Sequence, residues 1–250
     1  MPLVAANGLQ FHVQRLGAGP PVVMVHGLLI GSLASWYFTA APALAQRHRV
    51  LVYDLRGHGR SERPATGYDV ATMASDLAAL AGADLEPVDV VGHSWGALVA
   101  LRFAIDHPDR VRRLVLVEAP IPPSGVPELA GVFGSDVERL IDALPAQMRA
   151  MLAIGGRRGE RLLRSLHFLT SRTSVLADLH AEREFDDAEL ACVRAPCLVV
   201  CGDRSSCAPA GASLARSIAG ARHAVLPGGH YVHLDARDAL ARLIAEHLDG

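Results

Sequence analysis

The stretch Val88-Asp89-Val90-Val91-Gly92-His93-Ser94-Trp95-Gly96-Ala97 decides the fold. A short apolar stretch is followed by two glycines that flank a serine, with one residue between the serine and each glycine. After them, apolar residues recur at helical spacing from 97 to 105. A strand that turns sharply into a helix strains its middle residue, and flanking glycines remove the clashes of Cβ atoms. The pattern therefore predicts a serine hydroxyl above the carboxyl end of a buried strand, close to the positive end of a helix.

Five further apolar runs predict buried parallel strands, and helix-like segments separate most of them. The strand-like runs cover 22–25, 50–53, 114–117, 197–200 and 223–226, and the clearest helical patterns cover 72–80, 97–105 and 239–248. Asn7-Gly8 indicates a hairpin turn ahead of these runs. Alternating strands and helices predict a mostly parallel sheet with helices on both faces. The antiparallel hairpin disfavours a (β/α)₈ barrel.

A long gap without strand-like runs extends from about Ile121 to Val193. Its amphipathic pieces lie at 136–144, 146–154, 161–169 and 175–179. We therefore predict a core made of residues 1–119 and 193–250, with a helical insertion at 120–192 after the sixth strand.

Composition excludes several kinds of chemistry. The chain has 250 residues, and all 24 of its basic residues are arginine, so it has neither a phosphate loop ending in Gly-Lys-Ser/Thr nor a Schiff-base lysine. A net charge of −2 does not indicate electrostatic binding to nucleic acid or to an anionic membrane. The four cysteines lack the spacing of a zinc pair, and the N-terminus lacks a signal-peptide pattern. We expect a cytoplasmic protein with a small-molecule substrate, no cofactor, no metal, and no nucleic-acid or membrane partner. The sequence is compatible with a homodimer as well as with a monomer.

The chain resembles the α/β-hydrolase superfamily over essentially its whole length. Besides the serine turn, three motifs in the right order carry this resemblance: His26-Gly27, the segment Asp54-Leu55-Arg56-Gly57-His58-Gly59-Arg60-Ser61, and Gly228-Gly229-His230. The resemblance implies an eight-stranded, mostly parallel sheet with helices on both faces. It also identifies the insertion at 120–192 with the family's helical cap.

The resemblance implies roles for individual residues. Ser94 matches the nucleophile, and His230 matches the base that takes its proton. The backbone N–H groups of Leu28 and Trp95 match the donors that hold an oxyanion. We further expect three residues to line the substrate site: His26, Gly27 and His93. Because a serine stands where dehalogenases and epoxide hydrolases have an aspartate, those two reactions are excluded.

The acid of the triad departs from the family's pattern. That acid usually follows the glycine that ends the seventh strand by three residues, and this position holds Ser205. Two carboxylates remain as alternatives. Asp203 comes two residues earlier, and Glu118 directly follows the sixth strand, where some haloalkane dehalogenases have their acid. The spacing from Gly202 to Pro209 argues against a shifted loop, so we favour Glu118 by a small margin.

These residues predict a serine hydrolase that cleaves an ester, thioester or lactone of a small, largely apolar substrate. Hydrolysis of a C–C bond uses the same triad, so it is an alternative. Two others are a transferase or cyclase that excludes water from an acyl-enzyme, and a ligand-binding protein with a vestigial triad.

Overall fold

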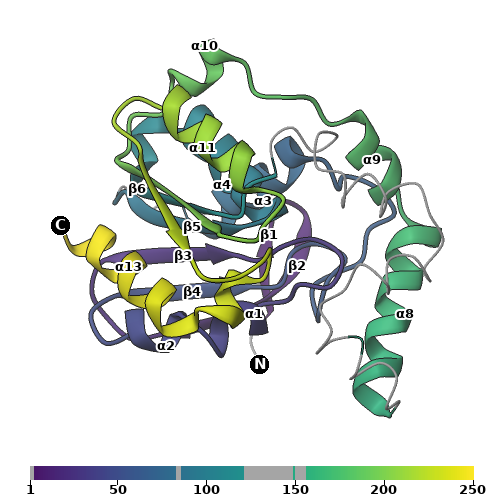
Figure 1. Ribbon diagram of the computed structural model, residues 1–250. Helices are drawn as coiled ribbons and strands as arrows, with labels where there is room; N and C mark the ends of the chain where they lie inside the picture. Colours follow the sequence, from purple (N-terminus) through teal and green to yellow (C-terminus); the bar gives the residue numbers. More distant parts are fainter. Residues whose placement is uncertain (1–2, 83–85, 121–148, 150–155) are drawn as a thin grey trace.

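The computed structural model describes residues 3–82, 86–120, 149 and 156–250, and these residues fold around one eight-stranded sheet (Figure 1). The strands are β1 (Leu3–Ala6), β2 (Leu9–Leu16), β3 (Pro21–Val25), β4 (Arg49–Tyr53), β5 (Val88–His93), β6 (Val111–Val117), β7 (Cys197–Gly202) and β8 (Arg222–Leu226). Their order is β1-β2-β4-β3-β5-β6-β7-β8. Strand β2 is antiparallel to both neighbours, and the other pairs are parallel. The predicted hairpin and mostly parallel sheet are confirmed.

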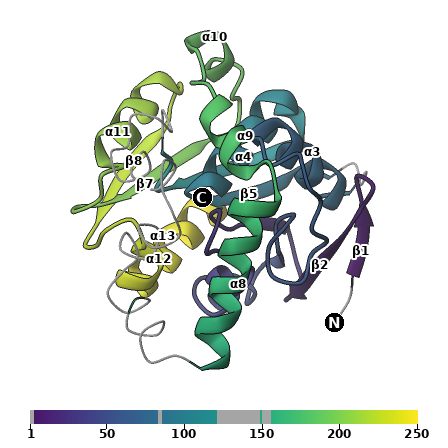
Figure 2. The same cartoon turned by 90° about the vertical axis from the view of Figure 1, so that its right-hand side faces the viewer.

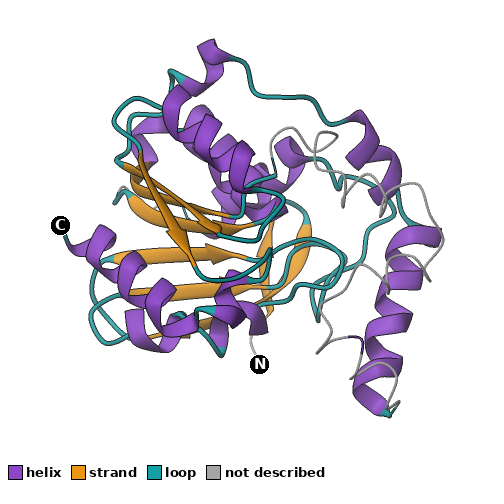
Figure 3. Ribbon diagram, in the orientation of Figure 1, coloured by secondary structure: helices purple, strands orange, loops and turns teal. Residues whose placement is uncertain are grey.

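Helices cover both faces of the sheet, as predicted (Figures 1 and 3). On one face lie α3 (Val70–Leu80), α4 (Trp95–Asp106) and α11 (Ala208–Ser217), and on the other lie α1 (Ala34–Tyr37), α2 (Ala41–Leu44) and α13 (Arg237–Asp249). The short helix α12 (Val232–Asp235) precedes α13, and a 3-10 turn, Pro108–Arg110, precedes β6. Burial of an apolar stripe from each helix against the apolar strands makes one core on each side of the sheet. No helix within the described residues has the length and apolar character needed to cross a membrane.

Three helices are described within the predicted insertion: α8 (Arg157–Arg172), α9 (Val175–Ala181) and α10 (Asp187–Leu190). The predicted pieces at 161–169 and 175–179 lie in α8 and α9, whereas those at 136–144 and 146–154 lie outside the described residues. Both α8 and α9 pack on the loop that joins β4 to α3 (Figure 2). Ser174 N–H donates to the oxygen of Ala65 at 2.8 Å, and Tyr68 N–H donates to Asp178 Oδ2 at 2.8 Å. The boundaries of a cap stay a prediction.

The turn between β5 and α4 brings backbone segments into very close contact. A Cβ on Gly96 would lie 2.5 Å from the oxygen of His26 and 2.6 Å from the oxygen of Val25, at the end of β3. A Cβ on Gly92 would overlap the backbone of Gly96. The residue between the two glycines, Ser94, has φ 54 and ψ −125, and its N–H donates to the oxygen of Val117 at 2.9 Å. Only glycine at both positions permits this turn.

We expect Gly96→Ala to destabilise the protein by about 3 kcal/mol or more, because the added methyl group meets two backbone oxygens that cannot move without shifting β3. Urea unfolding followed by circular dichroism measures this loss. Gly220→Ala is the matched control. Gly220 has φ 71, and nothing lies within 4 Å of the new Cβ. We therefore expect a loss of only about 1 kcal/mol in the free energy of unfolding, from the strain of a left-handed backbone at a non-glycine residue. Equal losses in the two variants would contradict the steric argument.

Candidate active site

Ser94 and His230 come together at the carboxyl edge of the sheet. Ser94 stands on the strained turn after β5, and His230 comes from the loop that follows β8. The Nε2 atom of His230 lies 2.9 Å from Ser94 Oγ. At that distance the imidazole nitrogen accepts the hydroxyl proton when the ring carries its own proton on Nδ1.

Glu118 lies on the other side of the His230 ring. It directly follows β6, has φ 56, and is fully buried. Its Oε2 lies 3.4 Å from His230 Nδ1. Two groups from the loop after β7 donate to the same carboxylate: Gly202 N–H reaches Oε1 at 2.5 Å, and the hydroxyl of Ser205 donates to Oε2. The buried carboxylate is therefore compensated by hydrogen bonds as well as by the histidine.

Asp203, the alternative carboxylate, points elsewhere. Its Oδ1 accepts a hydrogen bond from Gly228 N–H at 2.8 Å and lies 3.1 Å from Arg204 Nη1. The side chain is 49% exposed, whereas that of Glu118 is 0% exposed. Within the described residues no hydrogen bond or ion pair joins Asp203 to His230. The structure thus brings Glu118, and not Asp203, to the histidine.

The loop after β3 carries one of the predicted oxyanion donors, Leu28, and is held rigidly. His26 is buried below the loop, where its Nε2 accepts a hydrogen bond from Leu55 N–H at 3.0 Å and its Nδ1–H donates to the oxygen of Gly27 at 2.7 Å. Burial lowers the pKa of His26, so this ring is neutral and holds the loop from beneath. Neither Leu28 N–H nor Trp95 N–H meets an acceptor in the described part of the chain.

His93 binds the backbone of the residue that carries the candidate base. Its Nε2–H donates to the oxygen of His230 at 2.9 Å, and its ring centroid lies 4.4 Å from that of His233. Burial is the main cause that lowers the pKa of His93 well below its usual value, with smaller contributions from His233 and His230. Burial, with a smaller contribution from His230, lowers the pKa of His233 to about 4. Both rings are therefore neutral at neutral pH.

A cavity of about 250 Å³ opens over Ser94 and His230. Its wall is largely apolar and is formed by Gly27, Leu28, Ile30, Gly31, Ser32, Ala34, Ser35, His93, Ser94, His230, Tyr231, His233 and Leu234. Two of the three predicted lining residues, Gly27 and His93, belong to it, and His26 does not.

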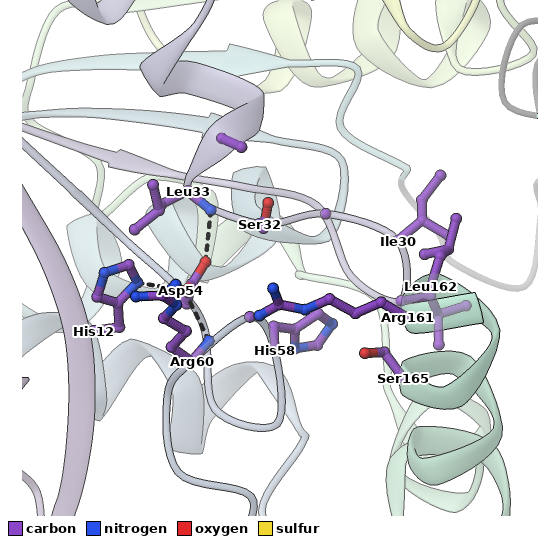
Figure 4. A pocket seen from close by; sticks show the side chains of 14 residues that line it. His12, Ile30, Ser32, Leu33, Asp54, His58, Arg60, Arg161, Leu162 and Ser165 are labelled. Atoms are coloured by element: carbon purple, nitrogen blue, oxygen red, sulfur yellow. Dashed lines mark hydrogen bonds and ion pairs between the residues drawn. The ribbon is translucent and has the colours of Figure 1, made fainter. Parts of the chain in front are cut away.

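A second cavity of about 310 Å³ adjoins the first and shares Ile30, Gly31, Ser32 and Ala34 with it; Figure 4 shows this second cavity. Asp54 lies in its floor, where Oδ1 accepts a hydrogen bond from Leu33 N–H at 2.8 Å and Oδ2 accepts one from Arg60 N–H at 3.0 Å. Arg161 extends from α8 into this cavity, and Ser165 lies one turn further along the helix. The second cavity differs from the first in its charged side chains, which are those of Asp54, Arg60 and Arg161.

Sequence reasoning missed two neighbours of the histidine and the carboxylate. Ser205 stands at the position of the usual acid, and its hydroxyl donates to Glu118. Cys207 Sγ lies 3.4 Å from His230 Nδ1, and Cys207 N–H donates to Ser205 Oγ at 3.1 Å. The sequence did single out Ser205, because a serine stands there in place of the family's usual acid. Nothing in the spacing of the cysteines pointed to Cys207.

A serine after β5, a histidine after β8 and a carboxylate after β6 meet at the carboxyl edge of this α/β sheet, the arrangement expected of a hydrolase-type site. The family model described as "alpha/beta hydrolase fold" matches residues 20–153, more than half of the chain, and the chain belongs to this family.

Similar proteins include several kinds of hydrolase. The chain is 42% identical over 115 residues to a soluble epoxide hydrolase of Corynebacterium sp. (strain C12), covering 45% of this chain and 39% of that protein. It is 41% identical over 121 residues to the 2-hydroxy-6-oxo-2,4-heptadienoate hydrolase of Pseudomonas putida, covering 47% and 44%. These matches span about two fifths of the relatives' length. The crystal structure of the enol-lactonase from Burkholderia xenovorans LB400 superimposes over the whole of both chains with a TM-score of 0.80 and 25% identity.

The buried neutral histidines make folding stability sensitive to acid. The pKa of His58 is lowered to about 3, chiefly by burial, and that of His233 to about 4. Above pH 6.5 both rings are neutral in the folded and unfolded states. Below pH 6.5 only the unfolded state gains the proton, so stability falls by up to about 1.4 kcal/mol per pH unit for each ring until the folded pKa is reached.

We therefore expect urea unfolding at pH 5 to report at least about 2 kcal/mol less stability than at pH 7. His233→Gln removes one of the two rings and lowers the slope of stability against pH. His223→Gln changes an exposed histidine in β8 and leaves the slope unchanged. A slope that is the same in both variants would show that His233 is not buried in its neutral form.

Proposed function

We propose that the protein hydrolyses an ester, thioester or lactone through an acyl-enzyme on Ser94. The observation that carries this proposal is the line of contacts at the carboxyl edge of the sheet. Ser94 Oγ lies 2.9 Å from His230 Nε2, and His230 Nδ1 lies 3.4 Å from Glu118 Oε2. A nucleophile, a base and an orienting carboxylate in this sequence of contacts are the parts that nucleophilic acyl transfer requires.

Ser94 is the nucleophile and His230 is the general base. As Ser94 Oγ forms a bond with the carbonyl carbon, its proton moves to His230 Nε2. The imidazolium then gives this proton to the departing alcohol, thiol or ring oxygen. A water molecule attacks the acyl-enzyme in the same way, and the carboxylic acid leaves.

Glu118 and two backbone groups stabilise the charges that form. The carboxylate keeps the His230 proton on Nδ1 and stabilises the imidazolium; Gly202 N–H and Ser205 Oγ–H hold it in place. The N–H groups of Leu28 and Trp95 receive the oxyanion, each worth about 3–4 kcal/mol in such reactions. His93 acts through His230, because it fixes the backbone oxygen of that residue.

The cavity over Ser94 favours a small and largely apolar acyl group. Its volume of about 250 Å³ limits the size of the acyl group, and its glycine, leucine, isoleucine and alanine residues offer apolar contacts beside the histidine, serine and tyrosine side chains. The similarity to the enol-lactonase, at 25% identity over the full length of both chains, supports a lactone among the candidate substrates.

Glu118→Gln is expected to lower kcat for a short p-nitrophenyl ester by about 10²–10⁴-fold, since the neutral amide no longer fixes the tautomer of His230. Asp203→Asn is the matched control, and we expect less than a tenfold effect because the described partners of the Asp203 carboxylate are Gly228 N–H and Arg204, not His230. Steady-state kinetics on both variants, with folding verified by circular dichroism, makes the comparison. A larger loss in Asp203→Asn would overturn the assignment of the acid.

A fluorophosphonate probe separates this proposal from its competitors. The wild-type protein should be labelled and should turn over the ester, and Ser94→Ala should do neither. Labelling without turnover across a panel of esters, thioesters and lactones would indicate a transferase or cyclase. Absence of labelling in a folded wild-type protein would indicate a ligand-binding role.

A second candidate is hydrolysis of a C–C bond in a substrate that carries a carboxylate. The observation that favours it is Arg161, which extends from α8 into the second cavity (Figure 4). This cavity shares Ile30, Gly31, Ser32 and Ala34 with the cavity over Ser94. The Pseudomonas putida relative is named for a dienoate, a carboxylate substrate. An arginine in the adjoining cavity is suited to hold such a group.

If the second candidate holds, Arg161→Ala should raise KM for a 2-hydroxy-6-oxo-dienoate about tenfold or more, with little change for neutral esters. Arg164→Ala is the control on the same helix, because Arg164 is exposed and pairs with Glu160 at 3.7 Å outside the cavity. Spectrophotometric assays with both substrates measure the effect. Equal KM values for the two variants would refute the role of Arg161.

A further inference from the structure

Three atoms of the kind that bind transition metals meet beside the candidate base. They are Cys207 Sγ, His230 Nδ1 and a carboxylate oxygen of Glu118, and they all lie within 4.8 Å of one another. Cys207 and Glu118 are fully or almost fully buried. The three residues come from three different segments: the start of α11, the loop after β8 and the end of β6. Among the described residues this is the one such group that includes a thiol, an imidazole and a carboxylate.

Two of the three separations between these atoms match those around a tetrahedral metal ion, and the third is within 4.8 Å. Ligand atoms bound to zinc at about 2.0–2.3 Å lie about 3.3–3.6 Å apart. Cys207 Sγ lies 3.4 Å from His230 Nδ1, and this nitrogen lies 3.4 Å from Glu118 Oε2. We propose that Glu118, Cys207 and His230 form an inhibitory binding site for a thiophilic divalent cation of the zinc class, such as Zn²⁺ or Cd²⁺.

The ligand set selects the class of cation. A thiolate and an imidazole nitrogen favour zinc-class ions, whereas Mg²⁺ and Ca²⁺ require several oxygen ligands. On binding, the metal–sulfur bond forms and the thiol proton of Cys207 leaves to solvent. The metal also takes the lone pair of His230 Nδ1, so the single proton of the neutral ring lies on Nε2. One proton is released in total, and affinity therefore rises with pH.

This change of tautomer has a direct consequence at Ser94. Nε2 lies 2.9 Å from Ser94 Oγ and accepts its proton in the proposed mechanism. With metal on Nδ1, Nε2 carries a proton and no longer accepts one. The bound ion also occupies the carboxylate that would orient the ring. The inhibition rests on the proposed function, whereas the binding of the ion rests on ligand geometry alone.

The other cysteines differ from Cys207 in ways that supply controls. Cys197 and Cys201 are buried in β7, and within the described residues neither of them belongs to a group of three metal-ligating side chains. Cys192 is exposed on the surface, and its Sγ lies 3.4 Å from the oxygen of Ala188. Cys192→Ala therefore removes a thiol that metals reach easily, without touching the proposed site.

Binding is tested with Cd²⁺ on Ser94→Ala protein, which has no turnover to complicate the measurement. We expect one ion per chain by calorimetry, with the ultraviolet charge-transfer absorption of a Cd–thiolate bond. Adding Cys207→Ala should remove this absorption and weaken binding at least about tenfold. Adding Cys192→Ala should leave both signals unchanged. Unchanged absorption and affinity in the Cys207 variant, or in Cys207→Ser if the alanine variant does not fold, would overturn the site.

Inhibition is tested on wild-type protein with Zn²⁺ and a short p-nitrophenyl ester, each protein being normalised to its own metal-free rate. We expect loss of more than nine tenths of the activity, recovery with a chelator, and a half-inhibiting concentration at least tenfold higher for Cys207→Ala than for Cys192→Ala. Full activity at saturating metal would overturn the inhibitory role. A protein that is inactive before metal is added would refute the proposed function instead, and the Cd²⁺ experiment would still decide the site.

Discussion

The close backbone contact between the first turn of α4 and the ends of β3 and β5 is the constraint on which the rest of this structure depends. Gly92 and Gly96 leave no room for a side chain there, so the turn between them takes one path and holds Ser94 at φ 54. The same turn touches the end of β3, from which the loop with Gly27 and Leu28 begins. The serine hydroxyl and the loop N–H groups therefore share one rigid support, and positional accuracy of this kind is worth orders of magnitude in rate.

Glu118 shows how a buried charge is accommodated when it leaves its usual place. An isolated carboxylate in the interior is strongly destabilising unless donors compensate it. The neighbouring strand β7 supplies them, because Gly202 N–H and the Ser205 hydroxyl both donate to Glu118. Because β6 and β7 are adjacent in the sheet, the segment after β6 can place the carboxylate and the end of β7 can place its hydrogen-bond donors. Ser205, which stands where the family usually has its acid, thus holds the proposed acid Glu118 in position.

The sequence was sufficient for the architecture but not for the surroundings of the histidine. Apolar runs, the Asn7-Gly8 hairpin and the serine turn each depend on local chemistry, so all eight strands and the elbow were predictable. Glu118 and Asp203 remained alternatives, since loop direction after a strand depends on packing with distant segments. The hydrogen bond from His93 to the oxygen of His230 joins residues 137 apart and leaves no trace in spacing. The same holds for Cys207, which a loop turn brings beside the ring.

The hydrogen bond between Ser205 and Glu118 also bears on how such a site changes during evolution. The two positions are in direct contact, so carboxylates at both would face each other in a buried, poorly hydrated space. One of the two would then stay protonated, because two adjacent like charges raise the pKa of one member of the pair. A lineage that moves its acid from one strand to the next therefore passes through a shared-proton pair, or through an intermediate with no carboxylate. The chain accordingly uses a single charged residue at these two positions, and a hydroxyl is the neutral partner that satisfies it.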